Sequence, residues 1–251
     1  MSTRPPVHTD RRRAESFGTA ALEYDRCRPR YPATLIADLV VGDGVRALDV
    51  GAGTGIASAQ LSAAGADVLA IEPDARMARV AADKGLAVEQ ATFEEWDPGL
   101  RSFDLVVFAQ SFHWVRPRSA LEKVAALLEP GGRLALLWNR ITPRSPSVDD
   151  LNAVYAGHLD VTARPSIEIE DQTTTLLQEC GFTVERRHVV EELHFGTDAW
   201  LELVFTYSNH LALEPMSRAQ LRSQLADRIG PDGVDATNDA LAVVAVRRPQ
   251  A

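Results

Sequence analysis

A glycine-rich turn is the part of the sequence whose residues and spacing are best suited to ligand chemistry. Gly51, Gly53 and Gly55 follow a short apolar run and precede the Ala-rich stretch Ile56–Ala64, which is helical in pattern. Glycine permits positive φ and has no Cβ, so a ligand can approach the backbone, and the helix start offers unpaired amides. The turn departs from the dinucleotide pattern Gly-x-Gly-x-x-Gly, because Ile56 stands at the third glycine position.

Two carboxylates accompany this turn. Asp49 lies two residues ahead of Gly51, where its charge would repel a phosphate but attract an ammonium group. Glu72 lies about twenty residues beyond the turn, at the end of the next apolar run, where a carboxylate can accept both hydroxyls of a ribose. The pair therefore predicts a ligand that contains a ribose and a positive charge.

The elements that must position these residues alternate in kind. Apolar runs such as 105–108 and 134–138 are nearly continuous, which is typical of parallel strands buried on both faces. We therefore predict a doubly wound α/β sheet. The expected strands are 45–50, 68–71, 86–90, 103–108 and 133–138, and the expected helices are 56–64, 74–84 and 118–128.

The two ends of the chain differ from this core. We expect one domain, made of a flexible tail and lid over 1–32, a cofactor-binding core over 33–140 and an acceptor-binding part over 141–251. The lid should contain a helix over 10–24, and another helix should begin near Pro32. After 140 we expect a loop over 141–150, helices over 151–159, 172–180, 198–211 and 217–229, and strands over 183–195 and 241–247.

Composition excludes several classes of protein. The chain has 251 residues, 45% hydrophobic and 24% charged, as in soluble globular proteins. Its net charge of −9 disfavours nucleic acid and anionic membranes as partners. Cys27 and Cys180 are too few for a disulfide framework, and the sequence offers no signal peptide or membrane span. We expect a cytoplasmic protein.

Several motifs in order resemble the class I S-adenosylmethionine-dependent methyltransferases. They are DVGAGTG at 49–55, Glu72, ATFEEW at 91–96, FDLVVFAQSFHWV at 103–115 and LLEPGGRLALLWN at 127–139. The closing LAVVAVRR is similar to the family's last strand. The resemblance implies a Rossmann-like, seven-stranded, mostly parallel sheet with an antiparallel last strand, an N-terminal helical lid and a helical insertion near the C-terminus.

The resemblance also implies residue roles. Asp49 and the turn would surround the methionine part of S-adenosylmethionine, Glu72 the ribose, and the segment after the third strand the adenine. The full set expected to bind the cofactor is Tyr24, Arg28, Asp49, Gly51, Ala52, Gly53, Gly55, Glu72, Pro73, Met77, Thr92, Phe93, Gln110 and Ser111. The acceptor would contact Tyr31, His113, Trp114, Trp200 and Tyr207, with Phe205, His210 and Met216 as further candidates for the pocket.

These expectations predict methyl transfer to oxygen, nitrogen or carbon of a small-molecule acceptor, leaving S-adenosylhomocysteine. His113 is the candidate for orienting or deprotonating the acceptor, or else a histidine hydrogen-bonded within a loop. No metal is expected, because His188 and His194 on one strand would lie about 20 Å apart. Two alternatives stay open: a non-catalytic protein that binds the cofactor, and a nicotinamide-dependent oxidoreductase. The acceptor and the oligomeric state are left undetermined.

Overall fold

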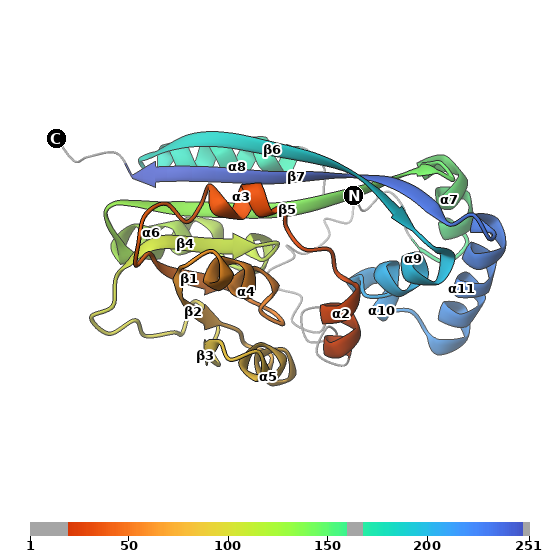
Figure 1. Cartoon of the computed structure of the whole chain (residues 1–251), viewed down its shortest axis with the longest axis horizontal. Coiled ribbons are helices and arrows are strands. Elements are labelled where there is room, and N and C mark those ends of the chain that lie inside the picture. The colour runs from red at the N-terminus through yellow and green to blue at the C-terminus, as the bar shows by residue number, and fades with distance from the viewer. Residues whose placement is uncertain (1–19, 160–167, 248–251) are drawn as a thin grey trace, which may run out of the picture.

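A seven-stranded sheet forms the centre of the molecule (Figure 1). The structure is a computed structural model that describes residues 20–159 and 168–247. The strand order is β3-β2-β1-β4-β5-β7-β6, and β7 runs antiparallel to its neighbours β5 and β6. This confirms the predicted fold class and the antiparallel last strand. The strands are β1 (Arg46–Val50), β2 (Asp67–Ile71), β3 (Ala87–Glu89), β4 (Phe103–Ala109), β5 (Leu128–Ser145), β6 (Phe182–Phe195) and β7 (Val234–Arg247).

Alternation along the central strands supplies a core to each face of the sheet. In β4, Val106 and Phe108 belong to one hydrophobic cluster, whereas Leu105 and Val107 belong to another. The first cluster includes residues of α6 (Pro117–Leu127) and α8 (Glu168–Glu179), and the second includes residues of α3 (Ala33–Ala37) and α4 (Ile56–Ala63). Because successive side chains point to opposite faces, an apolar run of this length requires helices on both sides.

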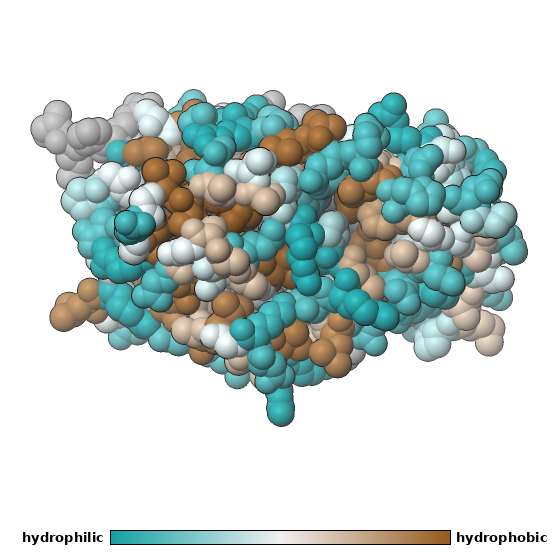
Figure 2. All heavy atoms as spheres, in the orientation of Figure 1, coloured by the Kyte–Doolittle hydropathy of each residue, from teal (hydrophilic) through white to brown (hydrophobic). Residues whose placement is uncertain are grey.

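The remaining helices lie at the ends of the sheet. In Figure 1, α5 (Ala75–Asp83) lies beside β3, and α2 (Ala21–Cys27) lies between the core and the C-terminal helices. A third hydrophobic cluster joins the far ends of β5 and β7 to the other helices. These are α7 (Val148–Tyr155), α9 (Thr197–Val204) and α11 (Pro215–Ile229), and the short helix α10 (Ser208–Leu211) lies between α9 and α11 in the chain. On the face shown in Figure 2, hydrophilic residues are interspersed with smaller hydrophobic areas.

The predicted loop over 141–150 is wrong in its first half. Residues Asn139–Ser145 continue β5 and pair with β7 across Asp235–Ala240, so β7 also begins seven residues before its predicted start at Leu241. Pro143 and the polar residues around it gave this stretch the pattern of a turn. The antiparallel pairing nevertheless continues, since Val234 and Ala236 are buried against the C-terminal helices.

Helix boundaries need three further corrections. The expected helix over 198–211 is two helices, because Thr206 donates its hydroxyl to Leu203 O at 2.6 Å and Tyr207 adopts an extended backbone. The helix expected over 151–159 begins earlier, at Val148, where Ser147 and Asp150 form a capping box. The helix expected over 10–24 is described only from Ala21, and it continues to Cys27; residues 10–19 lie outside the described ranges.

The aromatic cluster around Phe108 should contribute strongly to stability. Phe108 is fully buried and makes edge-to-face contacts with Phe93 at 5.6 Å and Phe112 at 5.3 Å between ring centroids. Phe108→Ala should lower the free energy of unfolding by about 3 to 5 kcal/mol, measured by urea denaturation. The exposed Leu100 provides a control, because Leu100→Ala should change that free energy by less than about 0.5 kcal/mol. Equal effects of the two substitutions would contradict this packing.

Candidate functional site

The candidate site lies where the strand order reverses between β1 and β4. From β1 the chain proceeds outward to β2 and β3, then returns to form β4 on the other side of β1. Ligands of open α/β sheets bind at such a switch point, outside the carboxyl ends of the strands. Here Gly51 after β1 approaches Ser111 after β4 so closely that a Cβ on Gly51 would lie 2.8 Å from the Ser111 Cβ. Ser111 also donates its hydroxyl to Val50 O.

Gly53 and Gly55 of the turn have different structural roles. Gly53 has a φ of +58°, and a Cβ added there would meet nothing within 4 Å, so its backbone borders open space. Gly55 begins α4 in a left-handed conformation, and a Cβ there would lie 2.6 Å from Leu86 Cδ1 and 3.0 Å from Ala81 Cβ. Gly55 therefore permits the close helix packing that a third glycine provides in dinucleotide folds, while Gly53 is open to a ligand.

Asp49, the second-last residue of β1, is a buried carboxylate of which one oxygen has a hydrogen-bond donor. Its Oδ2 accepts a 2.6 Å hydrogen bond from the Ser58 hydroxyl, whereas its buried Oδ1 has no partner among the described residues. Burial raises the pKa of Asp49 to about 6, and the bond from Ser58 opposes that shift. A buried carboxylate oxygen without a donor is costly, so this position fits a ligand that brings a positive charge or a hydrogen-bond donor.

Glu72 closes the turn from the end of β2. Its Oε2 accepts from Gly53 N at 2.7 Å and its Oε1 accepts from Asp74 N at 2.9 Å. Burial raises the pKa of Glu72 to about 7; the two backbone bonds lower it, and the charges of Asp74 and Asp49 raise it further. Each oxygen retains a further acceptor position, so the carboxylate can accept two hydroxyls while it holds the turn. Pro73 follows it directly, and Met77 of α5 is buried.

The segment after β3 differs from its expected role. Phe93, which was expected to bind the cofactor, is buried in the first hydrophobic cluster with its edge-to-face contact to Phe108, so its ring packs into the core. Thr92 instead donates its hydroxyl to Glu95 Oε2 at 2.8 Å. Lys123 of α6 donates to Phe93 O at 2.6 Å and so fixes the backbone of this segment. Any adenine contact here must come from the backbone or from neighbouring side chains.

The loop after β4 carries backbone strain at Gln110. This residue has a φ of +56°, which is uncommon for any residue other than glycine and costs on the order of 1 to 3 kcal/mol. Its amide donates to Leu137 O at 2.9 Å, and its side chain hydrogen-bonds Tyr31, which is buried. Strain of this kind is concentrated at functional sites. The loop therefore brings Gln110 and Tyr31 together. The positions of the two residues in the sequence do not predict this contact.

His113 and Trp114 follow in a short 3-10 helix, Phe112–Trp114. His113 is exposed, and its ring lies 4.7 Å from the Trp114 ring between centroids. Because this 3-10 helix follows β4 closely in the chain, both residues lie near the carboxyl edge of the sheet.

An ionic contact that the sequence analysis missed holds α2 against the glycine turn. Asp25 accepts from the Thr54 hydroxyl at 2.8 Å and forms an ion pair with Lys84, whose Nζ also donates to Thr54 O at 2.8 Å. Thr54 lies within the turn and Lys84 ends α5. The sequence contains one sign of this contact, the position of Asp25 next to Tyr24. Thr54 and Lys84, the partners of Asp25, are 29 and 59 residues away from it in the chain.

Arg28 links the same region to the C-terminal helices. Its guanidinium lies 4.6 Å from the Tyr24 ring centroid and 4.4 Å from that of Tyr207, and its Nη2 donates to Thr206 O at 3.3 Å. Its Nε is buried without a partner among the described residues. A cation between two aromatic faces is held in place by cation–π attraction, so Tyr24, Arg28 and Tyr207 form one unit.

The other residues expected at the acceptor site are separated. Trp200 is buried in the third hydrophobic cluster beside Phe195, whereas Met216 is 76% exposed. His210 is buried among the rings of Tyr155, Phe205 and Tyr207, and burial together with the charges of Arg218 and Arg28 lowers its pKa to about 4. The imidazole of His210 is therefore neutral near pH 7.

Metal and membrane features can be considered for the described part of the chain. His188 pairs with Asp239 at 2.9 Å and His194 with Asp235 at 2.7 Å, so each histidine has its own partner on β7. Within residues 20–159 and 168–247, no group of three metal-ligating side chains occurs. No helix in those ranges has both the length and the apolar composition of a membrane span.

Comparison with known proteins agrees with this geometry. Residues 48–136 match the model of a family described as a methyltransferase domain. An uncharacterized methyltransferase of Mycobacterium tuberculosis is 36% identical over 218 residues, which cover 85% of this chain and 84% of that protein.

Two solved structures share the fold. A putative type II methyltransferase from Anaeromyxobacter dehalogenans superimposes with a TM-score of 0.60 at 24% identity, covering 88% of this chain and 97% of the other. A methyltransferase from Thiobacillus denitrificans in complex with S-adenosylhomocysteine has a TM-score of 0.53 at 16% identity, covering 90% and 96%. The matches decide against the nicotinamide-dependent alternative. The chain belongs to the class I S-adenosylmethionine-dependent methyltransferases.

Proposed function

We propose that this methyltransferase acts on a small-molecule acceptor and holds S-adenosylmethionine at the carboxyl ends of β1, β2 and β4. The buried, unpartnered Oδ1 of Asp49 is the observation that carries the proposal for the cofactor's position. A cationic ammonium fits that oxygen, as the ammonium of the methionine part would. The residues present therefore fit the cofactor that the family uses.

Each wall of this site has a distinct task. Asp49 accepts the ammonium, the open backbone at Gly53 leaves room for the nucleoside, and Glu72 accepts the ribose hydroxyls while it remains bonded to Gly53 N. When bound, S-adenosylmethionine would supply a methyl group carried on a sulfonium sulfur, for transfer to a lone pair of the acceptor. The protein contributes mainly by orienting the two reactants.

The α2 helix supplies the lid. Asp25 fixes it to the turn through Thr54 and Lys84, and this places Tyr24 and Arg28 at the edge of the same site. A closed lid excludes water from a charged cofactor and strengthens the electrostatic contacts inside.

The acceptor side is built from the loop after β4 and from the unit that contains Arg28. Gln110 and Tyr31 lie together beside the turn, and Tyr207 faces Arg28. His113 is exposed at the same sheet edge and is our candidate for orienting the acceptor. The net charge of −9 favours a small molecule over a nucleic acid as acceptor. Trp200 has only a packing role in this proposal, because its ring is buried in the core.

Loss of the Glu72 carboxylate should weaken cofactor binding. Glu72→Gln removes charge-assisted hydrogen bonds to two hydroxyls, so the affinity for S-adenosylhomocysteine should fall by about 1 to 3 kcal/mol in calorimetry. Glu122→Gln makes the same charge change at an exposed position on α6 and should leave the affinity unchanged. Equal affinities of Glu72→Gln and Glu122→Gln would remove Glu72 from the site.

Cofactor binding should also release protons. The raised pKa values mean that Asp49 and Glu72 stabilise the ligand-free fold fully below about pH 4, and that this contribution is lost as the pH rises through 6 and 7. A cationic ligand favours the ionised carboxylates, so affinity should increase from pH 5 to about pH 7.5. Calorimetry near pH 6.5 in two buffers of different ionisation enthalpy measures the release directly. A pH-independent affinity without proton release would contradict these shifts.

Closure of the lid should be visible in hydrogen exchange. Amides of Ala21–Cys27 should exchange more slowly when S-adenosylhomocysteine is present, because the helix then packs on a filled site. Asp25→Asn removes the ion pair with Lys84 and should reduce this protection. Glu23→Gln, on the same helix, makes an equal charge change without breaking that contact and serves as the control. Identical exchange with and without ligand would argue against a lid.

A further inference from the structure

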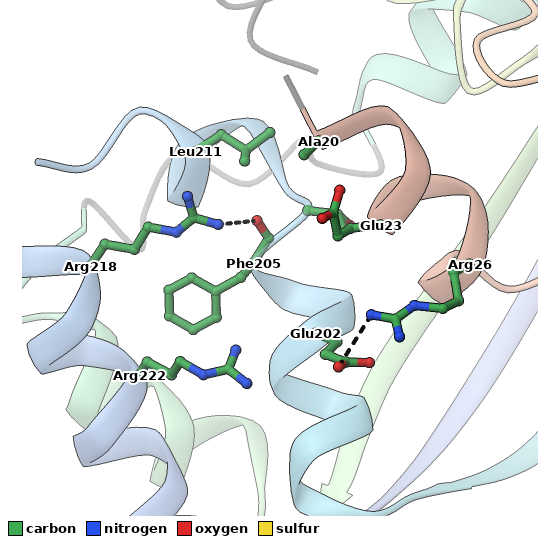
Figure 3. A pocket seen from close by; sticks show the side chains of 9 residues that line it. Ala20, Glu23, Arg26, Glu202, Phe205, Leu211, Arg218 and Arg222 are labelled. Carbon is green, nitrogen blue, oxygen red and sulfur yellow. Dashed lines mark hydrogen bonds and ion pairs between the residues drawn. The ribbon is translucent and has the colours of Figure 1, made fainter. Parts of the chain in front are cut away.

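A second pocket lies on the other side of the lid helix. It has a volume of about 460 Å³, which is in the range of sites for metabolite-sized ligands. Its walls come from α2, α9, α10, α11 and the residues that join α9 to α10 (Figure 3). The lining residues are Ala20, Glu23, Arg26, Glu202, Phe205, Thr206, Leu211, Arg218 and Arg222.

Two arginines of α11 converge on one aromatic ring in this pocket. The guanidinium carbons of Arg218 and Arg222 lie 5.6 and 5.7 Å from the centroid of the Phe205 ring. In Figure 3 the ring lies between the two guanidinium groups. Phe205 itself is buried, and both arginine side chains are half-buried. The ring thus fixes two cationic groups on the same wall.

Neither arginine has a carboxylate partner among the residues that the structure describes. Arg218 donates one hydrogen bond to Phe205 O at 3.4 Å, whereas the Arg222 guanidinium lies over the Phe205 ring. By contrast, Arg228 on the same helix forms an ion pair with Asp150. Half-buried guanidiniums with unused donors are suited to bidentate recognition of a carboxylate or phosphate.

Among the described residues, neither acidic residue of the pocket forms an ion pair with Arg218 or Arg222. Glu202 forms an ion pair with Arg26 at 3.3 Å, and it also accepts from the Cys27 thiol. In Figure 3, Glu202 lies between Arg222 of α11 and Arg26 of α2, and its drawn ion pair is with Arg26. Glu23 is exposed. The lining therefore carries three arginines against two glutamates, with Phe205 and Leu211 as apolar surface.

The pocket is separate from the glycine turn. Ala20, Glu23 and Arg26 recur at intervals of three residues and so lie along one face of α2. Asp25, which is bonded to Thr54 and Lys84 beside the turn, lies about 160° away from Glu23 around the helix at 100° per residue. A molecule in this pocket therefore has α2 between itself and the proposed methyl-transfer site.

We propose that this pocket is a second ligand site, which binds a small organic oxyanion with an apolar body. Arg218 and Arg222 hold the oxyanion, and Phe205 and Leu211 contact the body. Because α2 forms one wall, the ligand contacts the same helix that covers the cofactor. The site does not depend on the identity of the methyl acceptor.

Binding of simple probes to the full chain tests this site. We would titrate phenyl phosphate, benzoate and the neutral benzyl alcohol by calorimetry at constant ionic strength. At least one anion should bind, and benzyl alcohol should bind at least about tenfold more weakly, because it offers the guanidiniums no charge. The phosphate and carboxylate arms show which oxyanion the arginines prefer.

Variants of α11 locate the binding. Arg222→Gln and Arg218→Gln, each made separately, should lower the affinity for the preferred anion by about tenfold or more. Arg228→Gln makes the same charge change on the same helix outside the pocket and should alter the affinity by less than about twofold, since its ion pair is exposed. The affinity for S-adenosylhomocysteine should be the same in all three variants as in the parent protein.

Three results would overturn the proposal. The first is the absence of binding by either anion at millimolar concentration. The second is an equal loss of affinity in Arg222→Gln and Arg228→Gln, which would indicate only a general charge effect. The third is competition between the anion and S-adenosylhomocysteine, or methylation of the anion, because either would place it at the transfer site.

Discussion

The burial of Asp49 at the end of β1 is the constraint on which the cofactor site depends. A carboxylate that is fully buried and half satisfied is stable only when the surrounding backbone holds it rigidly or a ligand completes its contacts. Here Ser58 of α4 occupies one oxygen, and the other has no donor among the described residues. The site thus retains a hydrogen-bond acceptor, Asp49 Oδ1, that a cationic ligand can satisfy. The pKa of Asp49 is raised because burial disfavours its charged form.

The sheet order explains why this carboxylate meets the rest of the site. Because the strand order reverses between β1 and β4, the residues that follow these two parallel strands meet at one carboxyl edge of the sheet, where Gly51 lies close to Ser111. Glu72 enters from the neighbouring β2 and binds Gly53 N, so the ribose acceptor and the turn form one unit. The α2 helix then joins this unit to the C-terminal helices, through Asp25 on one side and Arg28 on the other.

The sequence predicted the parts of the fold that local patterns determine. The apolar runs and the glycine turn located β1, α4, β2, β4 and the positions of Asp49 and Glu72, because these depend on short stretches. The long antiparallel ends of β5 and β7 were missed, since Pro143 and its polar neighbours have the pattern of a turn and their pairing is a contact across about a hundred residues. The buried ring of Phe93 was missed for a similar reason, because only the packing against Phe108 distinguishes it from an exposed aromatic residue.

The lid illustrates the same limit. Tyr24 and Arg28 could be chosen by resemblance, but the contact that fixes the helix comes from Asp25, Thr54 and Lys84, which no spacing rule connects. The arginine pair on α11 was also missed, because its significance depends on a ring from another helix and on the acidic partners it lacks among the described residues.

The most direct test of the central claim is a calorimetric cycle with two ligands and two proteins. S-adenosylhomocysteine and its analogue without the α-amino group would each be titrated into the parent protein and into Asp49→Asn. The parent should bind the deaminated analogue at least about tenfold more weakly, whereas Asp49→Asn should barely distinguish the two ligands, since the amine then has no charged partner. Equal discrimination by both proteins would show that the ammonium lies elsewhere and would contradict the account.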